Sequence, residues 1–327
     1  LPVCKEIYQQ MQRIDNRIAN PAYYYDDSVM AGFIQYCENE ATLTTGDPLV
    51  LLDSFKLWAE DLLSWFYYII ETVWDPIEEA YVEKTVKRRL VNKQFIVLGR
   101  GGAKTMYDSL IQNYFLVVDP TTTHGVTTAP TLKQAEEVLS PIRTAITRSR
   151  GPLLKFLCKS NIAKGLGGGV NRQLVASTGK GIYNYINGSY IEPRALSINK
   201  MQGMRSKINT VDAWLSGDLR EDVIGALEQG ASKIPDYIII ATSSEGTVRN
   251  ASGDTVKIEI NSILDGSYVN DHVSIWYYKL DNINEVEDPR MWVKAQPNIG
   301  YTVSYETYQR DVEKMQNVPA SRNDILA

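Results

Sequence analysis

The stretch from Gln94 to Phe115, QFIVLGRGGAKTMYDSLIQNYF, constrains the fold more than any other part of the chain. A short apolar run, Phe95 to Leu98, predicts a buried strand, and a turn of small residues follows it. Lys104 and Thr105 then begin a segment whose apolar residues recur at helical spacing. A strand, a glycine-rich turn and a helix that starts with Lys-Thr form the context that a phosphate-binding loop requires.

Such a loop would bind the phosphates of a nucleotide. The turn directs backbone N–H groups inward, and the helix N-terminus adds its dipole. Lys104 would contact the outer phosphates, and the Thr105 hydroxyl would hold a magnesium ion. The match to GxxxxGK[ST] is imperfect, because Leu98 and Ala103 stand where that pattern has glycine. An ordinary strand–turn–helix with an exposed lysine is the alternative. The predicted nucleotide-binding residues of this segment are Gly99, Arg100, Gly101, Gly102, Ala103, Lys104 and Thr105.

Composition excludes several classes of protein. The chain has 327 residues, enough for one large domain or two ordinary ones. Its formal net charge of −5 argues against a globally basic nucleic-acid-binding protein, so DNA contacts would need local clusters of Lys and Arg. Three scattered cysteines and two histidines favour a reducing cytosol and argue against a disulfide framework or a histidine metal site. The apolar run Leu62–Trp74 is too short to span a membrane.

Strands and helices are expected to alternate along the chain. We predict one long aromatic helix over Leu51–Trp74, with Trp58 either in the core or beside the nucleotide base. A basic run at 84–89 follows, which we expect on a solvated face, the alternative being a nucleotide or nucleic-acid contact. After the loop helix, Gly125–Ala129 predicts a strand, and Pro130 marks the start of another helix. This alternation predicts an α/β fold with a mostly parallel sheet.

Two later strands are predicted to end in polar residues. Lys207 to Trp214, KINTVDAW, predicts a strand that ends at Asp212, as in the metal-holding strand of a phosphate-loop ATPase. A solvent-facing carboxylate at an ordinary strand end is the alternative. Tyr237–Ala241 is apolar throughout, as a central parallel strand should be. The polar residues that follow it could sense a γ-phosphate or simply form a turn, and they are Thr242, Ser243 and Ser244.

The last part of the chain changes character. Val273–Leu280 predicts a final strand, and Pro289–Thr302 is loop-like. Ser304 can cap a helix whose apolar residues share one face. Two glycine-rich segments, Gly167–Gly169 and Ser177–Gly181, lack the Lys-Thr and the helix of a phosphate loop, so we expect them to be turns.

In their order along the chain, several segments resemble the large subunit of tailed-bacteriophage terminases, the motors that package viral DNA. GRGGAKT resembles the arginine-containing phosphate loop of that family, and APTLKQAEEV at 129–138 resembles the strand and helix after it. MQGMRSKINTVDAW at 201–214 resembles the approach to the acidic strand, and IIIATSSEG at 238–246 the coupling strand. DPRMWVKAQPNIGYTVS at 288–304 resembles the segment that leads into the linker helix. The resemblance covers roughly residues 50–320 and depends on the ordered set.

The resemblance implies a P-loop NTPase fold of the additional-strand, catalytic-glutamate type. Helices would flank a mostly parallel central sheet, with small helical subdomains at both ends. We therefore expect an N-terminal helical segment at 1–49, an ATPase core at 50–270 and a C-terminal linker or lid subdomain at 271–327. The nuclease domain of the family would lie outside this chain.

The resemblance also implies an ATP hydrolase that uses ATP and Mg²⁺. Arg100 would sense phosphate charge, Asp212 would position the metal together with Thr105, and residues 242–244 would couple the nucleotide state to the C-terminal subdomain. Ala213 occupies the position of the catalytic glutamate. We interpret it as an engineered Glu→Ala substitution that slows hydrolysis; the alternative is that another residue activates the water.

The implied partners are double-stranded DNA, the portal protein and the small terminase subunit. The implied assembly is a homo-oligomeric ring on the procapsid, located in the host cytoplasm and transiently at the portal vertex, with no membrane. A ring would use an arginine in trans, and our candidates are Arg143, Arg148 and Arg150, followed by Arg194 and Arg205. Those three arginines could instead bind DNA or lie in solvent. Competing functions are a helicase- or remodelling-type ATPase and a scaffold with a vestigial loop.

Overall fold

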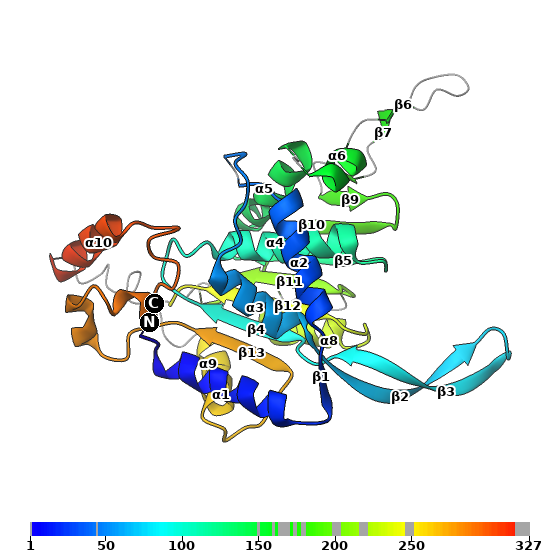
Figure 1. Ribbon diagram of the computed structural model, residues 1–327, viewed down its shortest axis with the longest axis horizontal. Coiled ribbons are helices and arrows are strands. Elements are labelled where there is room, and N and C mark those ends of the chain that lie inside the picture. The colour runs from blue at the N-terminus through cyan, green and yellow to red at the C-terminus, as the bar shows by residue number, and fades with distance from the viewer. Residues whose placement is uncertain are drawn as a thin grey trace.

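An eight-stranded sheet forms the centre of the computed structural model (Figure 1). The structure describes residues 2–43, 45–148, 151–158, 161–162, 171–172, 175–177, 181–197, 204–215, 222–245 and 252–317. The strand order is β13-β4-β12-β11-β5-β10-β9-β8. The strands from β13 to β10 in this order are parallel, and β9 and β8 continue antiparallel. The predicted α/β fold with a mostly parallel sheet is confirmed.

The strands that we predicted around the phosphate loop are present, because apolar runs buried on both faces suit a parallel sheet. β12 lies between β4, which leads into the loop, and β11, which ends at the acidic residue. The bounds of the strands in the sheet are β4 Lys93–Val97, β5 His124–Ala129, β8 Val175–Ser177, β9 Ile182–Asn184, β10 Ser189–Ala195, β11 Ile208–Asp212, β12 Ile238–Ser243 and β13 Val273–Tyr277. A short pair, β6 Asn161–Ile162 and β7 Asn171–Arg172, stands apart from it.

Helices cover both faces of the sheet. Alternate residues of β12 point to opposite sides: Ile238 and Ile240 join a core with the helices α3 and α4, whereas Ile239 and Ala241 join one with α8 and α9. The helices are α1 Lys5–Ala19, α2 Asp27–Glu40, α3 Asp53–Leu63, α4 Lys104–Val118, α5 Leu132–Arg148, α6 Pro152–Cys158, α8 Val223–Ala231, α9 Ser252–Leu264 and α10 Tyr305–Asn317. Two 3₁₀ turns, η1 Ile283–Glu287 and η2 Trp292–Lys294, precede α10. No helix in the described part of the chain is long and apolar enough to cross a membrane.

The predicted long aromatic helix over Leu51–Trp74 is wrong. The helix α3 ends at Leu63, and β2, Trp65–Asp75, follows it. From Tyr67 onward, half-buried and exposed residues alternate along β2, which is the period of a strand. β2 pairs antiparallel with β3, Ala80–Arg89, and with the short β1, Tyr23–Tyr25. In Figure 1, β2 and β3 extend as a ribbon away from the body of the molecule.

The basic run at 84–89 lies on β3 and is largely paired with acids or backbone. Lys84 pairs with Asp75 across the ribbon, and Arg88 pairs with Glu71. Arg89 donates to the carbonyls of Leu62 and Leu63 at the end of α3. The two ion pairs join the strands of the ribbon to each other, and the Arg89 contacts tie the base of the ribbon to α3.

The boundary that we expected after residue 270 is too early. β13, Val273–Tyr277, pairs with β4 in the central sheet, and the N-terminal helix α1 packs against β13. Farther along, Ser304 caps α10 by accepting a hydrogen bond from the N–H of Thr307 at 3.1 Å, as predicted. A separate small core joins η1, η2 and α10, and its members are Val286, Trp292, Ile299, Tyr308 and Val312. Of the two glycine-rich segments, Gly167–Gly169 and 178–180 lie outside the described residues.

Candidate nucleotide-binding site

Three predicted site segments meet at one edge of the sheet. β4, β12 and β11 are parallel neighbours, so their carboxyl ends lie side by side. Lys104 follows β4 and Ser244 follows β12, and Lys104 Nζ donates to Ser244 Oγ at 2.9 Å. Thr242 Oγ1 donates toward Asp212 Oδ1, at the end of β11, at 3.3 Å. Residues separated by more than a hundred positions in the sequence thus form one polar cluster.

The loop between β4 and α4 has the tight backbone that small residues permit. Gly101 has φ of 80° and Ala103 has φ of 60°, both in the left-handed region. A Cβ on Gly102 would lie 2.2 Å from Leu98 Cδ1 and 2.8 Å from Gln296 Oε1. α4 begins directly at Lys104, and the start of a helix presents N–H groups that have no partner within the helix. This arrangement is suited to an anion.

Lys104 is a desolvated cation, and its hydrogen-bond partners among the described residues are uncharged. Besides Ser244, its ammonium group donates to the carbonyls of Leu98 and Gly99, each at 3.2 Å. Burial lowers the Lys104 pKa to about 8; nearby Asp212 and Asp108 oppose this shift and Arg100 adds to it. An anionic phosphate would stabilise this charge better than neutral oxygens do.

Asp212 and Thr105 supply the oxygen ligands that Mg²⁺ prefers. Burial raises the Asp212 pKa, while Lys104 and hydrogen bonds from the Ala213 N–H and the Thr242 and Thr105 hydroxyls oppose the shift. The Thr105 hydroxyl therefore reaches the aspartate that we assigned to the same metal. Within the described ranges, no three His, Cys, Asp or Glu side chains group as metal ligands. A metal held here would complete its shell with phosphate oxygens and water.

Ala213 adopts a left-handed backbone conformation, with φ of 57°. Its N–H donates to the carbonyl of Thr242 at 2.8 Å, which ties the end of β11 to β12. Its methyl side chain has no group that could accept a proton from water. Ser243, the next residue of the coupling strand, accepts a hydrogen bond from the N–H of Leu215 at 3.2 Å. β11 and β12 are thus fixed to each other beyond the point where their ladder ends.

Sequence reasoning missed Asp108, a carboxyl group buried in this cluster. It lies on α4, one turn after Lys104, and is 0 % exposed. Thr242 Oγ1 donates to Asp108 Oδ2 at 2.8 Å. Burial, followed by the Asp212 charge, raises the Asp108 pKa well above its usual value. The four-residue spacing from Lys104, which puts both side chains on one helix face, is the signal that could have identified it.

Sequence reasoning also missed two side chains, far from the loop in sequence, that donate hydrogen bonds to its backbone. Gln296 Nε2 donates to the carbonyls of Gly99 and Arg100, at 3.3 and 2.9 Å. Asn298 Nδ2 donates to the carbonyl of Gly102 at 2.8 Å. The QPN sequence belongs to the segment that resembles the approach to the linker helix, so the loop and that segment are in direct contact.

Trp58 does not lie beside a nucleotide-binding surface. It is 0 % exposed, its indole N–H donates to the Tyr278 hydroxyl at 2.9 Å, and its ring contacts Phe55 and Tyr107. Of the two roles considered for Trp58, the core role is confirmed and the nucleotide-base role is wrong.

The candidate trans arginines have separate positions. Arg143 is partly buried on α5, and Arg148 donates to the carbonyl of Thr45 at 3.2 Å. Arg150 lies outside the described residues. Arg194 pairs with Glu192 on β10. In contrast, Arg100 lies exposed on the phosphate loop itself.

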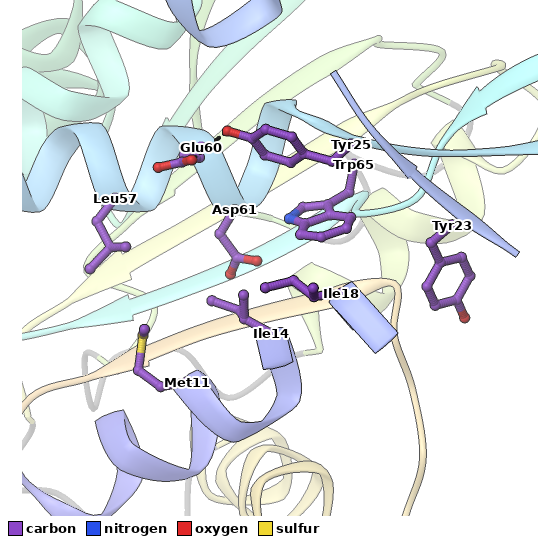
Figure 2. A pocket seen from close by; sticks show the side chains of 9 residues that line it. All are labelled: Met11, Ile14, Ile18, Tyr23, Tyr25, Leu57, Glu60, Asp61 and Trp65. Carbon is purple, nitrogen blue, oxygen red and sulfur yellow. Dashed lines mark hydrogen bonds between the residues drawn. The ribbon is translucent and has the colours of Figure 1, made fainter. Parts of the chain in front are cut away.

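A cavity of about 610 Å³ lies elsewhere, between α1, β1 and α3 (Figure 2). Figure 2 shows the Tyr25 hydroxyl directed at the Glu60 carboxylate on the wall. The buried Asp61 carboxylate is paired with Arg17. None of the predicted nucleotide-binding residues lines this cavity, whose walls are Met11, Ile14, Ile18, Tyr23, Tyr25, Leu57, Glu60, Asp61 and Trp65.

Comparisons with known proteins point to one family. A family model described as "Terminase large subunit, endonuclease domain" matches residues 269–327, the stretch that contains β13 and α10. The terminase large subunits of Lactococcus phages p2 and SK1 are each 24 % identical over 327 residues, covering 99 % of this chain. The chain spans about half of those relatives, 54 % of their length.

A solved structure has the same fold. The large terminase of bacteriophage HK97 matches with a TM-score of 0.67 at 16 % identity, over 90 % of this chain and 53 % of that one. At this identity the match establishes the architecture alone. The match in sequence along nearly the whole chain is to proteins of the same kind. In sequence and in architecture, the chain is similar to the large subunits of phage terminases.

Proposed function

We propose that this chain is the ATPase motor part of a terminase large subunit, which powers the movement of double-stranded viral DNA into a procapsid. The observation that carries the proposal is that Lys104, Asp212 and Ser244 lie together at one edge of the sheet. They lie beside the loop that precedes the 15-residue helix α4. A phosphate-loop ATPase requires a cation, a metal-holding carboxylate and a polar coupling strand in this arrangement.

In this mechanism the phosphates replace the neutral partners of Lys104. The Lys104 ammonium group and the N–H groups at the start of α4 bind and orient the outer phosphates of ATP. Thr105 and Asp212 would hold Mg²⁺, which would neutralise charge on the phosphates. Binding of the nucleotide would break the hydrogen bond between Lys104 and Ser244 and so change the contacts of β12. A change in the loop conformation would reach the C-terminal segment through the hydrogen bonds of Gln296 and Asn298.

Lys104→Ala tests the assignment. The substitution removes the only ammonium group in the described cluster, so we expect isothermal titration to show loss of ATP·Mg binding. Lys233→Ala, at an exposed position after α8, is the matched control and should bind normally. Unchanged affinity in Lys104→Ala would refute the phosphate-loop assignment.

The proposed assembly follows from the family. Copies of the chain would form a ring at the portal vertex of the procapsid, in the host cytoplasm, and contact DNA, the portal protein and the small terminase subunit. One arginine of each copy would stabilise transition-state charge on the neighbour's nucleotide. Arg143 and Arg148 are the described candidates for that role.

A further inference from the structure

Asp108 has no role in the mechanism above, yet it is buried at the centre of the site. Its side chain is 0 % exposed, and Oδ2 accepts a hydrogen bond from Thr242. Oδ1 has no hydrogen-bond partner among the residues that the structure describes. A buried carboxyl group with an unpaired oxygen costs stability, so its presence needs a reason.

The contact between Asp108 and Thr242 also involves the metal-holding aspartate. Thr242 Oγ1 lies 2.8 Å from Asp108 Oδ2 and 3.3 Å from Asp212 Oδ1. A hydroxyl has one proton and donates one hydrogen bond at a time. The shorter distance shows that Asp108 is the preferred acceptor, and the longer contact to Asp212 is the weaker one.

Asp212 needs free acceptor capacity for its proposed task. To hold Mg²⁺ directly or through bound water, its oxygens must face the ion or accept hydrogen bonds from that water. A Thr242 hydroxyl that donated fully to Oδ1 would occupy one of those lone pairs. The Thr242 hydroxyl cannot donate its single proton to Asp108 and Asp212 at the same time.

We propose that Asp108 is a positioning residue, which accepts the Thr242 hydrogen bond and so keeps Asp212 Oδ1 available to the magnesium site. The inference rests on the proposed ATPase function and adds a residue to it. Asp108 acts through Thr242 and does not itself touch nucleotide or metal. Because Thr242 lies on β12, the coupling strand and the metal site share one hydroxyl.

Asp108→Leu tests the proposal, because leucine has the same branched shape and no acceptor. The Thr242 hydroxyl should then turn to Asp212 and compete with the metal site. We expect the Mg²⁺ concentration that gives half-maximal tightening of ATP binding to rise about tenfold, the value of one hydrogen bond to a charged group. The affinity for ATP in EDTA should stay at the parent value. Calorimetric titrations with ATP, in EDTA and at graded Mg²⁺, measure both.

Three further variants separate positioning from a structural role. Asp108→Asn retains a carbonyl acceptor and should keep the parent Mg²⁺ dependence. Adding Thr242→Val to Asp108→Leu removes the competing donor and should restore it. Gln112→Leu removes another buried polar side chain of α4, which bonds Val126 and Thr210 instead, and should leave the Mg²⁺ dependence unchanged.

The outcomes are distinct. No shift in Asp108→Leu, an equal shift in Asp108→Asn, or no rescue by Thr242→Val would overturn the proposal. If Asp108→Leu does not fold, Asp108→Ala decides, alone and combined with Thr242→Val: the proposal expects the same rise in Asp108→Ala and its rescue by Thr242→Val, and the absence of either would contradict it. A parent chain that binds no ATP with Mg²⁺ would instead refute the ATPase function.

Discussion

The low pKa of Lys104 should make the proposed binding of nucleotide sensitive to pH. Burial lowers this pKa from 10.5 to about 8, so raising the pH from 7.5 to 9.5 should neutralise the lysine in the nucleotide-free protein. Bound phosphate favours the charged form, because an opposite charge at close range raises the pKa again. Binding above pH 8 must therefore include uptake of a proton by Lys104, and the affinity should fall as the pH rises.

The size of the effect follows from the shift. The affinity is divided by 1 + 10^(pH − 8), which is about 1.3 at pH 7.5 and about 33 at pH 9.5. ATP should therefore bind about 25-fold more weakly at the higher pH, a loss of about 1.9 kcal/mol. At pH 9, about 0.9 proton should be taken up for each ATP bound.

Calorimetry at constant Mg²⁺, in two buffers with different ionisation enthalpies, measures both the affinity and the proton uptake. Lys104→Arg is the matched control, since a guanidinium group stays charged throughout this range. Its affinity should be independent of pH, even if it is lower than that of the parent. A flat profile in the parent, or the same decline in Lys104→Arg, would refute the reasoning.

Three other predictions test the site. Ala213→Glu should raise ATP turnover by about 10²–10⁴-fold if a general base is missing at this position, and equal turnover of the two forms on assembled procapsids would contradict our interpretation. Gly102→Ala should destabilise the folded protein by about 1–3 kcal/mol, because its Cβ would lie 2.2 Å from Leu98 Cδ1; an unchanged free energy of unfolding argues against a tight loop. In the Ala213→Glu background, loss of hydrolysis in Arg143→Ala or Arg148→Ala should be rescued by mixing with subunits that lack the phosphate-loop lysine. A mutant arginine that only contacts DNA would show no such rescue.

Local signals predicted the central part of the fold. The strand before the loop and the helix after it follow from a short apolar run, glycines and regular spacing, all within about twenty residues. Asp212 could be placed at the site because the end of an apolar strand fixes where a side chain emerges in a parallel sheet. These features depend on neighbours in sequence, so the sequence was sufficient.

The remaining features depend on tertiary contacts. Residues 65–75 are apolar enough for a helix or a strand, and only pairing with β3 decides between them. Trp58 has the residue type of a base-stacking side chain, but its neighbours bury it. Gln296 and Asn298 each donate a hydrogen bond to a loop residue that lies 196 positions earlier in the sequence. No local pattern encodes contacts over this separation.

The contact between the phosphate loop and Gln296 also sets an order of events during synthesis. The loop leaves the ribosome 196 residues before the amide that holds the carbonyl of Arg100. At about 5–20 residues per second, this separation corresponds to roughly 10–40 s. During that interval the growing chain contains every residue of the loop but lacks its support, and β4 lacks its outer neighbour β13. A nascent chain therefore cannot complete the proposed nucleotide site early, and we expect any binding of ATP to be delayed until nearly the whole described chain has been made.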